Sequence, residues 1–140
     1  LTPWGKSDAV ACFHRVAEEV KRRSIALVFS DFFDPNPEFL RSLRHFQHKN
    51  CEVILFQILD PLESDFPFKG LIEFRDLETG ELLEVESEDC RAVYLEELNR
   101  AITGMKQFCG RMKMPFETMN TGTAFAQALL AYFHKREKMF

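Results

Sequence analysis

Residues 25–29 read Ile-Ala-Leu-Val-Phe, an apolar run without alternation that ends at Ser30-Asp31. Residues 53–59 read Val-Ile-Leu-Phe-Gln-Ile-Leu, and they end at Asp60-Pro61. Runs of this kind are typical of strands covered on both faces, as in a parallel sheet between helical layers. We therefore expect two parallel strands side by side, with Asp31 at the open rim of the sheet where the first strand ends.

Helical periodicity surrounds the two strands. Helices are expected at residues 9–22, 37–48 and 88–112, and from Thr121 or Thr123 onward after a short strand at residues 116–119. Ser7 or Asp8 is the expected N-cap of the first helix. This alternation predicts the α/β class, as a three-layer α/β/α, Rossmann-like parallel sheet.

Residues 71–86 do not follow this alternation of strands and helices. Apolar residues alternate with charged ones about a Glu78-Thr79-Gly80 turn, which predicts an inserted antiparallel β-hairpin. Only three core strands are visible, whereas doubly wound sheets have five or six. We therefore expect residues 1–140 to form a single domain whose first strands lie upstream of Leu1.

Composition excludes several classes of protein. The 140 residues are 46% hydrophobic, with fifteen Phe, and they suffice for one folded core. The net charge of −4, with basic residues dispersed among acidic ones, argues against nucleic-acid binding. There is no long apolar stretch that would contact a membrane. Four widely spaced cysteines, Cys12, Cys51, Cys90 and Cys109, indicate reduced thiols in a cytoplasmic setting.

The candidate functional residues lie at the expected rim of the sheet. The carboxylate of Asp31 suits a hard cation such as Mg²⁺, and the hydroxyl of Ser7 would add a second oxygen ligand. The structural alternatives are a turn role for Asp31 and an N-cap role for Ser7. Asp31 and Asp34 are also an alternative pair for acid–base or phosphoryl-transfer chemistry.

Two further patterns favour structural explanations. Gly5-Lys6-Ser7 resembles the end of a phosphate-binding loop, but the first glycine of that motif would fall before Leu1. His45, His48 and Cys51 are spaced by three, as in zinc sites. Both histidines project away from the apolar stripe of their helix, so we expect them to be solvated.

Four segments together resemble a known family: residues 22–31 (RRSIALVFSD), 52–61 (EVILFQILDP), 66–68 (FPF) and 74–80 (FRDLETG). They resemble the bacterial "domain of unknown function" family number fifty-eight, which is related to von Willebrand factor type A domains. The resemblance covers nearly the whole chain. It implies the carboxyl-terminal part of a Rossmann-like domain that supports protein contacts and is often encoded beside MoxR-type AAA+ ATPases.

The resemblance also implies a metal-ion-dependent adhesion site. Such a site combines an Asp-x-Ser-x-Ser loop, a separate Thr and a separate Asp. Asp31 matches the last Asp, Ser7 stands roughly where the Thr would be, and the loop would lie upstream of Leu1. The resemblance implies that the full-length domain can hold Mg²⁺, and no strong binding is expected for these 140 residues.

The expected function is that of a non-enzymatic protein-interaction module that binds a protein partner. The expected location is the cytoplasm. Segments upstream of these residues could anchor the parent protein to a membrane. The alternative is a hydrolase or phosphoryl-transfer domain that uses Asp31 and Asp34. Without upstream strands, the strand at residues 25–30 would be an apolar sheet edge. We therefore also expect self-association.

Overall fold

The computed structural model describes residues 9–20, 24–33, 37–76 and 79–137. The chain divides into two compact units. The first comprises Leu1–Gln57 and Met105–Glu117, and the second comprises Ile58–Gly104 and Thr118–Phe140. Within the described residues, no helix combines the length and apolar character that a bilayer crossing requires.

A three-stranded sheet contains β1 (Ile25–Ser30), β2 (Glu52–Leu59) and β5 (Phe116–Asn120), in the order β1-β2-β5. β1 and β2 are parallel and run in register, with Leu27 opposite Ile54. This confirms the side-by-side parallel strands and the Rossmann-like α/β class that the two apolar runs predicted. Helices flank the sheet, as the class requires.

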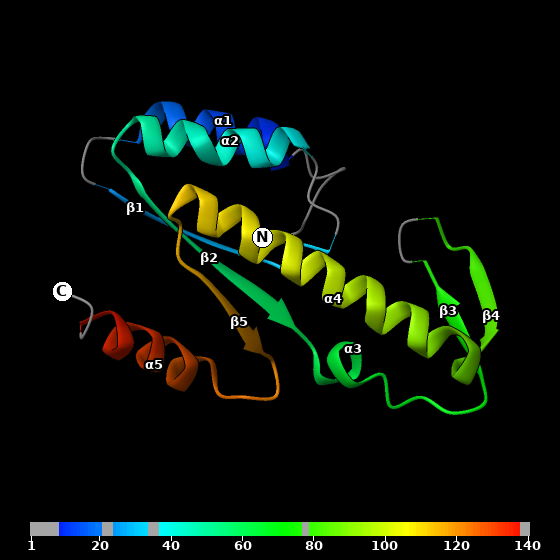
Figure 1. The fold of residues 1–140 in the computed structure, drawn as a ribbon. Coiled ribbons are helices and arrows are strands. Elements are labelled where there is room, and N and C mark those ends of the chain that lie inside the picture. The colour runs from blue at the N-terminus through cyan, green and yellow to red at the C-terminus, as the bar shows by residue number, and fades with distance from the viewer. Residues whose placement is uncertain (1–8, 21–23, 34–36, 77–78, 138–140) are drawn as a thin grey trace. The chain divides into compact units, whose positions relative to one another are not determined.

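The core of the first unit lies between this sheet and three helical segments. α1 (Ala9–Glu19) and α2 (Pro37–His48) lie side by side (Figure 1), and the end of α4 (Ser87–Met112) joins them. Leu43 and Phe46 of α2 are almost fully buried, and the Phe13 ring of α1 meets the Phe46 ring edge-on at 5.9 Å between centroids. The apolar stripes that predicted these helices are therefore the surfaces that form the core.

The two apolar runs differ in how they are covered. Residues 53–57 of β2 are all buried, as expected for a central strand. In β1, however, only Val28 is buried, whereas Ile25, Leu27 and Phe29 are 58%, 41% and 44% exposed. The expectation that β1 is covered on both faces is wrong for the described residues, because Ile25, Leu27 and Phe29 share one face of the strand and that face is largely exposed.

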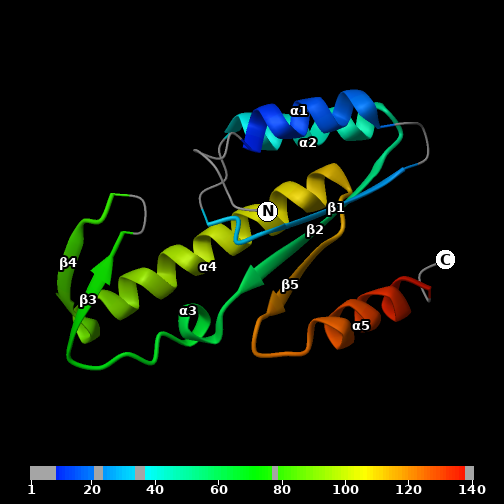
Figure 2. The same ribbon diagram turned by 180° about the vertical axis from the view of Figure 1, so that it is seen from behind.

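The second unit contains the predicted hairpin. β3 (Leu71–Arg75) pairs antiparallel with β4 (Leu82–Glu86), and the turn includes Gly80 with a φ of 76°. A positive φ is accessible to glycine at little steric cost. Figure 2 shows the hairpin from behind, with β3 and β4 side by side. The unit also contains the short helix α3 (Pro61–Asp65), which the sequence analysis did not predict, and α5 (Phe125–Glu137).

Phe66 joins the hairpin to α4. It follows α3 with a φ of 44° and is 2% exposed. Its ring lies 5.0 Å from that of Tyr94 in α4, 6.4 Å from that of Phe74 in β3 and 5.1 Å from that of Phe68. Aromatic pairs at these separations add to the stability that area burial provides. The Phe-Pro-Phe motif thus has a packing role in this unit.

Candidate functional site

Asp31 follows the carboxyl end of β1, as predicted, and its side chain is exposed. The Phe33 N–H donates a hydrogen bond to Asp31 Oδ1 at 3.3 Å, and the Ser30 hydroxyl donates to the same oxygen at 3.4 Å. A carboxylate that accepts from the N–H two residues later forms an Asx turn. The turn role that the sequence left open for Asp31 is therefore present.

Gln57 fixes the backbone of the same turn. This β2 residue is fully buried, and its Nε2 donates to the Asp31 carbonyl oxygen at 2.7 Å. A buried amide side chain needs partners because its desolvation is costly. Gln57 therefore ties the end of β1 to the neighbouring strand, a connection that the sequence analysis missed because the residue appeared only as part of an apolar run.

The described residues do not form a metal centre by themselves. Mg²⁺ prefers a near-octahedral set of oxygen ligands, with one or two carboxylates. Asp31 supplies one carboxylate, and none of the described segments brings together three His, Cys, Asp or Glu side chains that could hold an ion. Ser7 and Asp34 lie outside the described residues, as do the Ser7 or Asp8 cap and Gly5-Lys6-Ser7.

A second polar arrangement joins the ends of β2 and β5. The Thr121 hydroxyl donates to Asp60 Oδ2 at 2.7 Å, and the Leu62 N–H donates to Asp60 Oδ1 at 2.8 Å. The Asp60 N–H donates in return to Glu63 Oε2 at 2.8 Å, which completes a capping box at α3. The Leu62 N–H and the Thr121 hydroxyl lower the pKa of Asp60 below its ordinary value.

Gly122 allows the two loops to approach closely. A Cβ atom at this position would lie 2.9 Å from Asn120 Oδ1 and 3.0 Å from Pro61 Cγ. The Gly122 N–H donates to that same Asn120 oxygen at 2.7 Å. A larger residue would therefore push apart the loops that Asp60 and Thr121 join.

A cavity of about 530 Å³ lies within the second unit beside these loops. This volume falls within the range of small-molecule sites. Its walls combine apolar side chains with the loop that precedes α5, and the lining residues are Ile58, Met119, Asn120, Thr121, Gly122, Thr123, Ala124, Phe125 and Ala128. The exposed surface of the cavity walls is mostly apolar. The Thr121 hydroxyl donates its hydrogen to Asp60 and keeps its acceptor lone pairs.

The histidines and cysteines have the structural roles that the sequence favoured. His45 and His48 are exposed, whereas Cys51 is buried, so the three do not converge on one position. All four cysteines are free: Cys51 and Cys109 are buried, Cys90 is half-buried and Cys12 is exposed. Burial raises the pKa of Cys109 to about 11. A thiol of this kind is a poor nucleophile at neutral pH.

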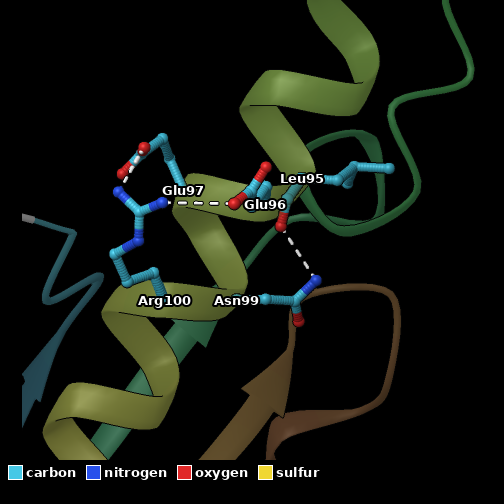
Figure 3. A network of polar contacts seen from close by, with 5 residues as sticks. All are labelled: Leu95, Glu96, Glu97, Asn99 and Arg100. Atoms are coloured by element: carbon cyan, nitrogen blue, oxygen red, sulfur yellow. Dashed lines mark hydrogen bonds and ion pairs between the residues drawn. The ribbon is translucent and has the colours of Figure 1, made fainter.

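The polar network on α4 is a solvated helix surface. Arg100 donates to Glu97 Oε1 at 2.6 Å and to Glu96 Oε1 at 3.2 Å, and Asn99 donates to the Leu95 carbonyl oxygen at 2.8 Å (Figure 3). These side chains are largely exposed, and such pairs contribute little to stability. Residues spaced by three or four positions are neighbours on a helix surface, so these contacts need no bound ligand to explain them.

Comparison with known families identifies the chain's family. The model of a family described as "Protein of unknown function DUF58" matches residues 2–102. The chain belongs to the DUF58 family. The match includes β1, β2, the hairpin and most of α4, and it confirms the family that the four sequence segments indicated. The comparisons of this DUF58 chain with curated proteins and with solved structures gave no match.

Proposed function

We propose that this chain is a non-enzymatic protein-interaction module that binds a partner chain along β1. The observation that carries the proposal is the exposed apolar row of Ile25, Leu27 and Phe29 on β1, which lies at the edge of the sheet that the described residues form. The strand itself, residues 25–30, contains no charged residue. An uncharged apolar edge strand lacks the features that normally prevent pairing with another chain.

Asp31 and Phe33 extend the proposed surface beyond the strand. Phe33 is 43% exposed, and Asp31 presents its carboxylate directly after β1. The turn hydrogen bonds and Gln57 hold this part of the backbone in place. A preorganised carboxylate at the end of an apolar row would give the partner a charge contact that fixes its register.

The resemblance to von Willebrand factor type A domains suggests the partner class to test first, a MoxR-type AAA+ ATPase. Membership of DUF58 supports this choice, because the resemblance to that family is what implies the partner class. A Mg²⁺-dependent contact would need oxygen ligands in addition to Asp31, such as Ser7 and the loop that the resemblance places upstream.

The proposal can be tested by measuring the affinity of this chain for a purified MoxR-type AAA+ ATPase by biolayer interferometry. Leu27→Lys should weaken binding by at least about tenfold, because it places a charge in the apolar row. Val93→Lys is the matched control, since Val93 is an exposed apolar residue of α4. Equal affinities for the parent and Leu27→Lys chains would reject β1 as the binding surface.

A second set of measurements addresses Asp31. Asp31→Ala should weaken binding, and a titration with Mg²⁺ shows whether the ion contributes. Unchanged affinity of Asp31→Ala, with and without Mg²⁺, would reject the role of this carboxylate. The enzyme alternative predicts hydrolase or phosphoryl-transfer turnover that Asp31→Asn abolishes, and such turnover would overturn the non-enzymatic proposal.

A further inference from the structure

The negative charge of the chain is concentrated around the hairpin. Residues 71–89 contain eight acidic residues and one arginine, whereas the rest of the chain carries a net charge of +3. The segment therefore has a net charge of −7, which is larger in magnitude than the net charge of −4 of the whole chain. Surface charges of one sign attract partners of the opposite sign and repel copies of themselves.

The register of the hairpin separates its side chains into two faces. One face carries the pairs Leu71–Glu86, Glu73–Glu84 and Arg75–Leu82, and the other carries Ile72–Val85 and Phe74–Leu83. Glu73 and Glu84 lie directly opposite each other, which destabilises an isolated pair of strands. Among the described residues, no ion pair neutralises Glu73, Glu84 or Glu86.

The outer edge of β4 combines these carboxylates with available backbone groups. The Asp76 N–H donates to the Glu81 carbonyl, and the Ser87 N–H donates to the Gly70 carbonyl. Hydrogen-bonded pairs alternate along an antiparallel ladder, so Leu83 and Val85 bond to β3. The N–H and C=O groups of the residues between and beside them, Leu82, Glu84 and Glu86, point away from β3.

Both faces of β4 also expose apolar surface. Leu82 is 58% exposed on the acidic face, and Leu83 is 61% exposed on the opposite face. Within the described residues β4 pairs with β3 alone, so its second edge has no neighbouring strand (Figures 1 and 2). A third strand placed beside β4 would bring its own alternate side chains beside Glu84 and Glu86 on one face, and beside Leu83 and Val85 on the other.

We propose that the outer edge of β4 binds an extended segment of a partner protein in which Lys or Arg alternates with apolar residues. The basic side chains would pair with Glu84 and Glu86, and the apolar side chains would extend the face formed by Leu83 and Val85. The segment would become the third strand of the hairpin sheet. This inference does not rest on the proposed function, because it concerns different residues.

A second copy of this chain does not fit the edge as well. Two β4 strands paired with each other would bring the Glu84 and Glu86 carboxylates of both copies close together, and like charges across a sheet are destabilising. The charges on β4 also suit a purely protective role, because charged edge strands resist aggregation. If the charges were only protective, the affinity for a basic peptide would not depend on whether its basic and apolar residues alternate.

The decisive experiment uses a short fluorescein-labelled peptide in which Lys and Val alternate, and measures amide hydrogen exchange by NMR. In the free chain, the amides of Leu83 and Val85 should already be protected, whereas those of Leu82, Glu84 and Glu86 should exchange rapidly. Bound peptide should slow exchange at Leu82, Glu84 and Glu86. Unchanged exchange at these three amides with the peptide bound would overturn strand addition.

Fluorescence anisotropy with variants tests the chemistry of recognition. The double substitution Glu84→Lys/Glu86→Lys should weaken peptide binding by at least about tenfold, because attraction becomes repulsion at two positions. Glu96→Lys/Glu97→Lys makes the same change in net charge on α4 and should have little effect. Equal losses in both variants would show that only net charge matters, and would overturn the proposal.

Two further comparisons complete the test. An isomeric peptide with its lysines grouped together should bind at least several-fold more weakly than the alternating peptide, and equal binding would count against strand addition. Leu82→Pro removes an outward N–H while keeping both carboxylates, so it should weaken binding more than Leu82→Ala does. Equal effects of Leu82→Pro and Leu82→Ala would contradict a backbone contact at Leu82. Self-association of the chain through β4 would also contradict the proposal.

Discussion

The Thr121 hydroxyl donates a hydrogen bond of 2.7 Å to Asp60 Oδ2 across a sequence separation of 61 residues. The contact joins the end of β5 to the end of β2, and Asp60 at the same time caps α3. Each oxygen of the Asp60 carboxylate accepts one of these hydrogen bonds, Oδ1 from the Leu62 N–H and Oδ2 from the Thr121 hydroxyl. Asp60 is therefore a structural residue at an edge of the sheet where ligands often bind.

Removal of this contact should destabilise the loops around α3. Asp60→Ala loses both the cap and the bond to Thr121, whereas Thr121→Val loses only the latter. Asp60→Ala should therefore lower the midpoint of urea unfolding more than Thr121→Val. Chemical denaturation followed by circular dichroism provides the comparison. A double variant no less stable than Asp60→Ala would confirm that the two residues act together.

The same carboxylate should make stability depend on pH in the acid range. Its pKa is lowered in the folded chain from an ordinary value of 3.8, so the stabilisation is present above that value and is lost as the pH falls through the folded pKa. The difference in stability between the parent chain and Asp60→Asn should therefore shrink below the ordinary value. Urea titrations at several acid pH values would measure it, and a constant difference would contradict the assignment.

Gln57 should stabilise the turn at Asp31. Gln57→Leu keeps an apolar body in the buried strand but removes the bond to the Asp31 carbonyl, and we expect a loss of about 1 kcal/mol in unfolding free energy. NMR chemical shifts of Asp31 and Phe33 should move, because their backbone loses its anchor. Unchanged shifts would show that the turn holds its conformation without Gln57.

The core of the first unit should be sensitive to truncation of α2. Leu43 is fully buried, so Leu43→Ala should cost about 2–5 kcal/mol of unfolding free energy. Val16→Ala on α1 is the matched control, because Val16 is 46% exposed and should lose much less. Equal losses at the two positions would contradict the packing described for α1 and α2.

The cysteines should differ in their rates of alkylation. Cys12 is exposed on α1, whereas burial raises the pKa of Cys51 and raises that of Cys109 to about 11. Iodoacetamide at mildly alkaline pH should therefore modify Cys12 first, and Cys51 and Cys109 only when urea unfolds the chain. Mass spectrometry of tryptic peptides would identify the order, and rapid modification of Cys109 in the native chain would contradict it.

The fold was largely predictable because its main signals are local. The apolar runs at residues 25–29 and 53–59 predicted a parallel pair, and the alternation about the Glu78-Thr79-Gly80 turn predicted the hairpin. An apolar run does not reveal how many neighbours cover it, however. The exposure of Ile25, Leu27 and Phe29 therefore could not be inferred from their residue types.

The arrangement of the rim was less predictable because it depends on distant residues. Asp31 was identified from its place after a strand, but its bond to Gln57 required the register of two strands. The sequence contains part of the information needed to predict the Asp60–Thr121 contact. Asp60-Pro61 with Glu63 has the spacing of a capping box, and Thr121 lies two residues after the strand predicted at residues 116–119. Only the order of strands in the sheet brings the two residues together.

The uneven distribution of charge has a kinetic consequence. A basic partner diffusing toward the chain would be steered to the segment of residues 71–89 before any close contact forms, and dissolved salt would screen that attraction. Added salt should therefore slow the association of a cationic partner much more than it changes the lifetime of the complex. Binding at the uncharged strand of residues 25–30 should show no comparable slowing.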